Sequence, residues 1–276
     1  MSKNKVKYRY IYIIISIFNL IICCTILAYI NDGHKANNSD KPINIANEHY
    51  TYDFQLELDN INDRDEYINK VKSYYTPEFI VSDLYKIIEI THKLFEANSI
   101  RYWIDGGTSI GALRHKDLIP WDDDLDICIL AEDEIKLQNL KSEFDKYGYN
   151  LDYNNFAYKI SLKTNKFNEK LKSSYPYLDI SVMRKDRGNY VYLNWNLQKN
   201  FPKNYYPETK LFPLKAYQFG KFKLWGPNDL YWYVTHYYGD DVLVTGYIYP
   251  NHGEYFNIYF GIKQGEKPIK VKLFGK

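Results

Sequence analysis

A short acidic segment constrains the fold of this chain more than any other feature, because it joins a carboxylate cluster to an apolar strand. From Asp124 to Leu130 polar and apolar residues alternate, which is the period of a β-strand. Carboxylates on one side of such a strand repel one another when ionised unless a cation lies between them. The segment therefore predicts a metal site at the start of a buried strand. Its acidic residues are Asp122, Asp123, Asp124 and Asp126, and the first, third and fourth are expected to point the same way.

Carboxylate oxygens are the ligands that hard divalent cations prefer, so the expected cofactor is Mg²⁺ or Mn²⁺. A solvated loop is the common alternative for an acidic run. This run, however, follows the apolar Ile119-Pro120-Trp121 and leads directly into an apolar strand. A calcium loop of the EF-hand type needs glycine at its sixth position and glutamate at its twelfth. Counted from Asp122, those positions hold Ile127 and Asp133, which excludes the EF-hand.

Length and composition indicate one main domain. A chain of 276 residues with 45% hydrophobic content is enough for one sizeable core and a tail segment. The net charge is +2 and the Lys and Arg residues are scattered, so no nucleic-acid partner is expected. Cys23, Cys24 and Cys128 do not have the spacing of a disulfide framework.

An uncharged apolar run from Tyr10 to Ile30 has the length of a single transmembrane helix. A cleaved signal peptide would have a shorter apolar region and a small-residue cleavage site, and Ile26 occupies an upstream position that should be small. Basic residues precede the run, which leaves the N-terminus in the cytosol and the bulk of the chain outside it. A single-pass type II membrane protein is expected, in the Golgi if the source is eukaryotic. The basic residues are Lys3, Lys5, Lys7 and Arg9.

The chain is expected to have four parts. Residues 1–9 form a cytosolic tail and residues 10–30 the anchor. Residues 31–75 are polar and lack clear periodicity, as in a stem that spaces a domain from the bilayer. Residues 76–276 are expected to form the catalytic domain.

Hydrophobic periodicity predicts an α/β domain, with a mixed sheet covered by helices. Helical spacing runs from Ser82 to Asn98, and a short strand, Ile100–Ile104, then ends at Asp105-Gly106-Gly107. Helices are also expected from Thr108 to Arg114, over 131–147 with Gly148 as a stop signal, and over 227–238. Further strands are expected over 149–153, 156–163, 177–184 and 189–195, in a hairpin over 213–225, and after Gly246.

A glycine turn between the predicted strand and helix is a candidate phosphate site. Glycine lets the backbone approach a phosphate, and the N–H groups at a helix start face the anion. An ordinary turn has the same sequence, but here the basic run Arg114-His115-Lys116 and the acidic strand follow closely. Candidate phosphate-binding residues are Gly106, Gly107, Thr108, Ser109, Arg114 and His115.

Two charged residues occur in later apolar strands. Asp179 lies in the apolar run Pro176–Val182. A lone acid in such a strand either has a structural role, with its carboxylate paired inside the protein, or binds a cation. A metal held by Asp124 and Asp126 would supply that cation, so Asp179 is a candidate third ligand. Lys159 is either a surface charge or a cation near phosphate oxygens.

The sequence Gly107-Thr-Ser-Ile-Gly-Ala-Leu-Arg-His-Lys-Asp-Leu-Ile-Pro-Trp-Asp-Asp-Asp-Leu-Asp-Ile127 closely resembles the signature of the LicD and fukutin family of phosphotransferases. The resemblance covers roughly residues 80 to 245. Later blocks resemble the family in the expected order, namely Tyr158-Lys-Ile, Tyr177-Leu-Asp-Ile-Ser, Phe212-Pro-Leu-Lys, Gly226-Pro-Asn and Tyr238-Gly-Asp-Asp241.

The resemblance implies a nucleotidyltransferase-type fold and a metal-dependent enzyme. Such an enzyme transfers a phosphorylated alcohol or sugar group from a nucleotide diphosphate donor, commonly a CDP compound, to a glycan hydroxyl. The matched block carries the metal role over to Asp124 and Asp126, with Asp122 assisting, and Asp179 corresponds to the later acid of the family pattern. Either Asp179 or Asp122 would orient or deprotonate the acceptor hydroxyl.

Two other functions remain open. The same fold can attach the nucleoside monophosphate itself to the acceptor. A membrane-anchored glycan-binding scaffold without activity would usually have lost one metal carboxylate, and Asp124, Asp126 and Asp179 are all present.

Overall fold

The computed structural model describes residues 74–168 and 173–248, residues 69 and 72, and the backbone of two strands, 55–57 and 269–274. The chain divides after Asn44 into two units, and every described residue belongs to the second. The predicted anchor at residues 10–30 lies outside the described residues. Among the helices that are described, none combines the length and the apolar character needed to cross a bilayer.

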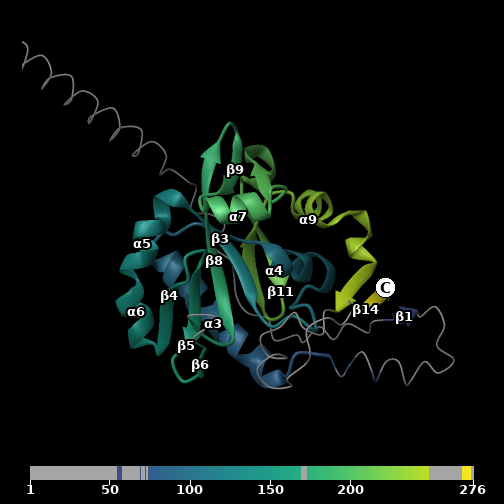
Figure 1. Ribbon diagram of the computed structural model, residues 1–276, viewed down its shortest axis with the longest axis horizontal. Coiled ribbons are helices and arrows are strands. Elements are labelled where there is room, and N and C mark those ends of the chain that lie inside the picture. Colours follow the sequence, from purple (N-terminus) through teal and green to yellow (C-terminus); the bar gives the residue numbers. More distant parts are fainter. Residues whose placement is uncertain are drawn as a thin grey trace, which may run out of the picture. The chain divides into compact units, whose positions relative to one another are not determined.

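A seven-stranded mixed sheet forms the centre of the described domain (Figure 1). Its strands are β2 (Tyr102–Ile104), β3 (Leu125–Leu130), β4 (Tyr149–Tyr153), β5 (Tyr158–Leu162), β8 (Tyr177–Asp186), β9 (Asn189–Tyr192) and β10 (Tyr205–Pro207). The order is β10-β9-β8-β3-β2, and β5 pairs with both β8 and β4. Strands β3 and β8 run parallel, and their other pairings in this sheet are antiparallel. The predicted mixed sheet is confirmed.

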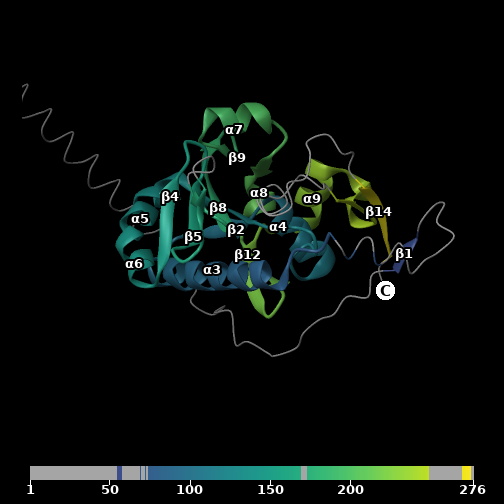
Figure 2. The same ribbon diagram turned by 60° about the horizontal axis from the view of Figure 1, so that its bottom comes forward.

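Helix α3 (Glu78–Ala97) covers one face of this sheet (Figure 2). Its N-cap is Pro77, whose carbonyl accepts the N–H groups of Ile80 and Val81. Its buried side chains recur at the predicted helical spacing, and burying each large apolar side chain contributes about 1.5–3 kcal/mol. They are Ile80, Leu84, Ile87, Ile88, Thr91, Leu94 and Phe95.

The helix predicted over 131–147 is interrupted. It consists of a 3-10 turn (Ala131–Asp133), α5 (Glu134–Asn139) and α6 (Lys141–Lys146). At the break, the Leu140 N–H donates to the Leu137 carbonyl three residues back rather than four, while the Leu140 side chain is buried. Gly148 follows α6 with a φ of +84°, as its predicted role of stop signal requires.

The later part of the domain packs short elements around the sheet. The predicted hairpin and helix are confirmed as β11 (Lys215–Phe219), β12 (Phe222–Gly226) and α9 (Leu230–Tyr238). The strand predicted over 189–195 ends at Tyr192, because the Asn194 side chain accepts the N–H groups of Asn196 and Leu197 and so begins α7 (Trp195–Asn200). The remaining elements are α4 (Gly106–Ile110), a π-helical turn (Gly111–His115), β6 (Phe167–Asn168), β7 (Ser173–Ser174), α8 (Glu208–Leu211) and a 3-10 turn (Asp240–Leu243).

A second, three-stranded antiparallel sheet joins distant parts of the chain. Its order is β1 (Gln55–Glu57), β14 (Ile269–Phe274) and β13 (Thr245–Ile248). Strands β13 and β14 agree with the expectation of further strands near the C-terminus. Strand β1 lies within residues 31–75, the segment that the sequence indicates as a stem.

Candidate functional site

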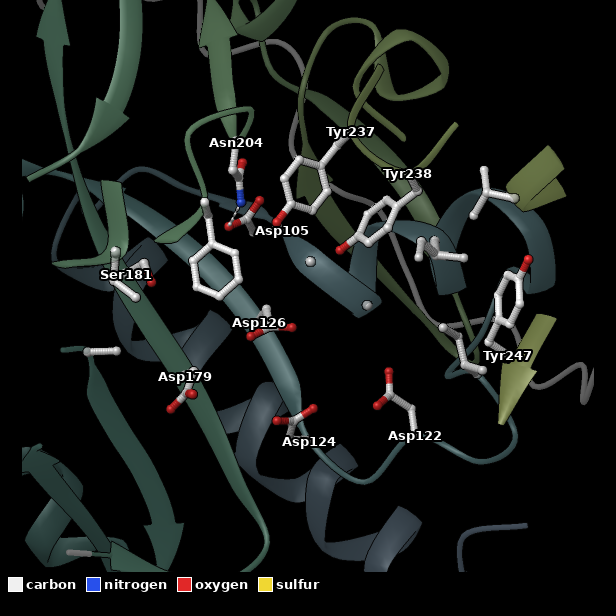
Figure 3. A pocket seen from close by; sticks show the side chains of 18 of the residues that line it. Asp105, Asp122, Asp124, Asp126, Asp179, Ser181, Asn204, Tyr237, Tyr238 and Tyr247 are labelled. Atoms are coloured by element: carbon white, nitrogen blue, oxygen red, sulfur yellow. Dashed lines mark hydrogen bonds between the residues drawn. The ribbon is translucent and has the colours of Figure 1, made fainter. Parts of the chain in front are cut away.

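A cavity of about 510 Å³ opens beside the first residues of β3 and β8. Carboxylates of these two strands lie at its centre (Figure 3). One wall comes from the turn between β4 and β5 and from α7, with Asn154, Phe156, Leu197 and Phe201. A second wall comes from the end of α9 and the segment after it, with Tyr237, Tyr238, Asp241 and Tyr247. The cavity therefore has an acidic centre between two walls that carry aromatic residues.

Strand register brings the predicted charged residues together. Asp126 on β3 and Asp179 on β8 are direct partners across the parallel pair. Lys159 on β5 is the direct partner of Asp179 on the other side. Directly paired residues lie on the same face of a sheet, so three residues that are far apart in sequence form one row across three strands.

Four predicted carboxylates line the cavity, namely Asp122, Asp124, Asp126 and Asp179. Carboxylate oxygens of Asp122, Asp123 and Asp124 lie within 4.8 Å of one another. Asp123 does not line the cavity, because its carboxylate accepts a hydrogen bond from the Tyr175 hydroxyl in the interior. In Figure 3, Asp122 lies on one side of the Asp124–Asp126 strand and Asp179 on the other.

Burial and mutual repulsion perturb the central carboxylates. Burial raises the pKa of Asp124 well above its ordinary value, and Asp126, Asp122, Asp123 and Asp179 raise it further. The pKa of Asp126 is also raised well above its usual range, first by burial and then by Asp179, Asp105 and Asp122, while Lys159 opposes the shift. A divalent cation would remove this repulsion, so the oxygen-only donor set fits the predicted Mg²⁺ or Mn²⁺.

Lys159 contacts Asp179 rather than the cavity. Its Nζ lies 2.5 Å from Asp179 Oδ1 and 3.3 Å from the centroid of the Tyr177 ring. The lysine is buried, whereas the Asp179 carboxylate is partly exposed to the cavity. Burial raises the pKa of Asp179 and Lys159 opposes that rise. The lysine therefore fixes one oxygen of Asp179 and leaves the other for the cavity.

The two glycines give the carboxylates room. A Cβ on Gly106, whose φ is +49°, would lie 2.4 Å from Asp126 Oδ2. A Cβ on Gly107 would lie 2.5 Å from Asp122 Oδ2. Both glycines line the cavity. The glycine turn is thus required by the close approach of the backbone to the acidic centre, a reason that the sequence alone did not give.

Replacing Gly106 with alanine is expected to lower activity by about 10²-fold, since a misplacement of about 1 Å at a reacting group has an effect of this size. The new methyl group must displace the Asp126 carboxylate, because the neighbouring atoms belong to that side chain. Gly148→Ala is the matched control, because Gly148 also has a positive φ but nothing within 4 Å of its added Cβ. Equal activity losses in the two variants would contradict the assignment.

Three other predicted residues lie behind the site. Thr108, Ser109 and His115 are buried and do not line the cavity, so the structure does not bring them to a ligand there. Thr108 Oγ1 accepts the N–H of Asp126 at 2.8 Å. Burial lowers the pKa of His115 to about 3, with a further contribution from Arg114.

Arg114 lines the cavity, but its guanidinium is bonded to the main chain. Its Nη1 donates to the carbonyls of Val242 at 2.7 Å and Thr245 at 3.0 Å. Burial lowers its pKa to about 10, and Asp122 opposes this shift. Arg114 therefore holds the segment after α9 against the cavity.

Asp105 is a cavity residue that the sequence did not single out. One of its oxygens accepts from Tyr206 at 2.6 Å and from Tyr233. The other accepts from Tyr192 at 2.8 Å, Cys128 at 3.2 Å and Asn204 at 3.4 Å. These donors belong to β3, β9, β10, α9 and the turn before β10, so Asp105 connects distant parts of the chain.

Tyr237 and Tyr238 were also missed as site residues. In Figure 3 they lie opposite the carboxylates, with the Tyr237 hydroxyl near Asp105. Burial raises the pKa of both, with contributions from Asp105 and Asp126. The block that begins at Tyr238 was recognised in the sequence, but no local pattern indicated that it would face the acidic strand.

Comparison with known proteins matches residues 99–229 to the domain described as LicD/FKTN/FKRP, nucleotidyltransferase domain. An uncharacterized protein of Rickettsia prowazekii is 37% identical over 180 residues, which is 65% of this chain and 62% of that protein. Human ribitol 5-phosphate transferase FKRP is 27% identical over 185 residues, which is 64% of this chain and 35% of FKRP.

A shorter match involves the lipopolysaccharide cholinephosphotransferase LicD of Haemophilus influenzae. It is 54% identical over 41 residues, which is 15% of this chain and 16% of LicD. The matched region thus spans 62% of the Rickettsia protein and about a third of FKRP.

Proposed function

Because residues 99–229 match the LicD/FKTN/FKRP nucleotidyltransferase domain, we propose that this chain is a phosphotransferase. It transfers a phosphorylated alcohol or sugar group from a nucleotide diphosphate donor, a CDP compound in the first instance, to the hydroxyl of a glycan. The observation that carries the proposal is the row of Asp126 and Asp179 beside Asp124 in one cavity. The names of two relatives, a ribitol 5-phosphate transferase and a cholinephosphotransferase, support the reaction class.

Asp124, Asp126 and Asp179 would hold Mg²⁺ or Mn²⁺. When bound, the cation would neutralise the diphosphate and the phosphoryl group in transfer. The protein supplies the geometry of this site. The register of strands β3 and β8 places Asp126 beside Asp179. The hydrogen bond from Lys159 to Oδ1 of Asp179 then holds the orientation of that carboxylate.

The acceptor hydroxyl must lose a proton when it attacks phosphorus, and two carboxylates are in position to accept it. Asp122 and Asp179 lie on opposite sides of the central strand and both line the cavity (Figure 3). Burial raises the pKa of Asp179 and so strengthens this carboxylate as a base, although Lys159, bonded to its Oδ1, opposes the rise. The two candidates can be separated by pH–rate profiles of Asp122→Asn and Asp179→Asn, because loss of the base removes the acidic limb.

Gly106 and Gly107 form the part of the cavity lining nearest to Asp126 and Asp122. Because neither glycine has a side chain, the Asp126 and Asp122 carboxylates can lie directly against the backbone there. Aromatic side chains on both walls offer flat apolar surfaces to a base or a sugar ring. The site thus combines an acidic centre for the reacting phosphate with surfaces for the two substrates.

The test is incubation of the full chain with CDP-ribitol, CDP-choline and other nucleotide-linked donors, with and without Mn²⁺, in the presence of glycan acceptors. Release of CMP together with an acceptor heavier by the phosphorylated group is expected. An acceptor heavier by CMP would instead identify nucleotidyl transfer. Absence of turnover with every donor, while the glycan still binds, would favour the inactive scaffold and contradict the proposal.

A further inference from the structure

Four exposed apolar side chains lie on α7, beside its ends or in the turn that is bonded to it, at the edge of the cavity. Trp195 is 68% exposed, Phe156 46%, Phe201 44% and Leu193 42%. The Asn194 side chain donates to the Asn155 carbonyl at 2.8 Å and so ties the turn between β4 and β5 to α7. We call these four side chains the α7 rim. Exposed apolar side chains that gather in one place mark an interaction surface more often than scattered ones do.

The α7 rim continues one wall of the cavity. Phe156 and Phe201 line the cavity and are also exposed. Figures 1 and 2 both place α7 beside β9, at one end of the central sheet. Whatever covers the rim therefore lies next to the mouth of the cavity rather than on a remote face.

The charge of the segment indicates the kind of partner. Residues 193–204 include Lys199 and Lys203, both exposed, and contain no acidic residue. Exposed Trp, Phe and Leu beside lysines are the combination by which a protein surface enters the boundary between lipid headgroups and acyl chains. Lysines there are attracted to anionic headgroups.

A glycan is the other partner that exposed aromatic residues can bind. Among the amides of this segment, Asn196 and Asn200 are exposed to sugar hydroxyls, whereas Asn194 and Asn204 are engaged within the protein. Asn194 caps α7 and bonds to Asn155, while Asn204 is buried and bonded to Asp105. Leu193 offers no ring for stacking, whereas it suits an acyl boundary.

We propose that the α7 rim docks on a membrane surface that carries anionic headgroups, with Trp195 at the level of the upper acyl chains and Lys199 and Lys203 at the headgroups. This contact is made by the folded domain and does not depend on residues 10–30. It brings the mouth of the cavity to the membrane surface.

The chain offers its own probe for the test. All five tryptophans, Trp103, Trp121, Trp195, Trp225 and Trp232, lie between residues 103 and 232. Fluorescence quenching by lipids brominated on the acyl chains therefore reports on the folded domain, even in the full chain with its N-terminal segment. The experiment compares the wild type with Trp195→Phe in vesicles of phosphatidylcholine and phosphatidylglycerol. Trp225→Phe is the matched control, because Trp225 lies on β12 and donates to Glu96.

Quenching in the wild type, its loss in Trp195→Phe and its retention in Trp225→Phe are the expected results. Replacing Lys199 and Lys203 with glutamine, or omitting phosphatidylglycerol, should also reduce the quenching. No tryptophan quenching in the full chain would overturn the proposal, and so would quenching that is lost in Trp225→Phe. If Trp195→Ala impairs glycan binding while vesicles quench nothing, the rim is a glycan platform and the membrane proposal is wrong.

Discussion

Replacing Asp126 with asparagine is expected to lower transfer by on the order of 10³-fold or more, comparable to the loss of a major electrostatic group of an active site. Asp126 is central to the site, because it pairs with Asp179 across the parallel strands and lies beside Asp124. The amide is a poorer ligand for a hard cation than the carboxylate. Mononucleotide release at saturating Mn²⁺ measures the effect.

The same substitution is expected to stabilise the protein in EDTA. The pKa of Asp126 is raised by burial and by neighbouring carboxylates, so the folded state binds more protons than the unfolded state above about pH 4. The free energy of unfolding then falls as pH rises from there through the raised pKa. Asparagine removes this contribution, and a gain of about 1 kcal/mol near neutral pH would raise the melting temperature by about 2–4 °C.

Asp186→Asn is the control for both effects, because Asp186 lies at the far end of β8, outside the cavity, and is partly exposed. It should leave transfer unchanged and should not raise the melting temperature in EDTA. A variant at Asp126 that retains full transfer would reject the metal assignment. A variant that loses transfer but melts lower than the wild type in EDTA would show that the carboxylate supports the fold instead.

Replacing Asp105 with asparagine is expected to lower the stability by about 2–4 kcal/mol, because buried hydrogen bonds to a carboxylate are among the strongest in a protein. Five side chains donate to this carboxylate. An amide of the same shape turns an NH₂ group toward those donors, which leaves two or more of them without an acceptor. Thermal unfolding should show a melting temperature lower by about 5–15 °C.

Tyr192→Phe is the matched control for Asp105, because it removes one of the donors and leaves the carboxylate with the others. Its expected loss is about 1 kcal/mol. Similar losses in the two variants would indicate that the carboxylate contributes little beyond a single hydrogen bond. Unchanged stability of Asp105→Asn would contradict the role assigned to this cluster.

Local sequence patterns were enough to predict the acidic strand and most of the helices and strands around it. The alternation after Asp124 predicted strand β3, and the helical spacing from Ser82 to Asn98 predicted most of α3, which begins earlier, at Glu78. Asp179 could be linked to the acidic strand only by the argument that a lone buried acid needs a cation and by the family resemblance. The register that makes it the partner of Asp126 depends on a parallel pairing between strands about 50 residues apart, which no local pattern encodes.

The residues that local patterns misjudged have long-range partners. Thr108 and His115 looked like ligands for phosphate because they lie near the glycine turn, but both are buried behind it. Asp105 looked like part of the turn, whereas its partners lie between residues 128 and 233. The strand predicted over 189–195 ends early, because the Asn194 side chain caps the start of helix α7. A polar residue's role depends on which distant groups reach it, and periodicity carries no information on that.

The pairing of β1 with β14 bears on how a shortened form of this protein should be prepared. A chain cut at Thr76, where the sequence places the start of the catalytic domain, would lack β1 and leave one side of β14 uncovered. Bare strand edges recruit other chains, and β13, on the other side of β14, carries Thr245 and Tyr247 of the cavity. An expression fragment that begins upstream of Gln55 keeps this edge closed, and it is the better starting point for crystals and for assays.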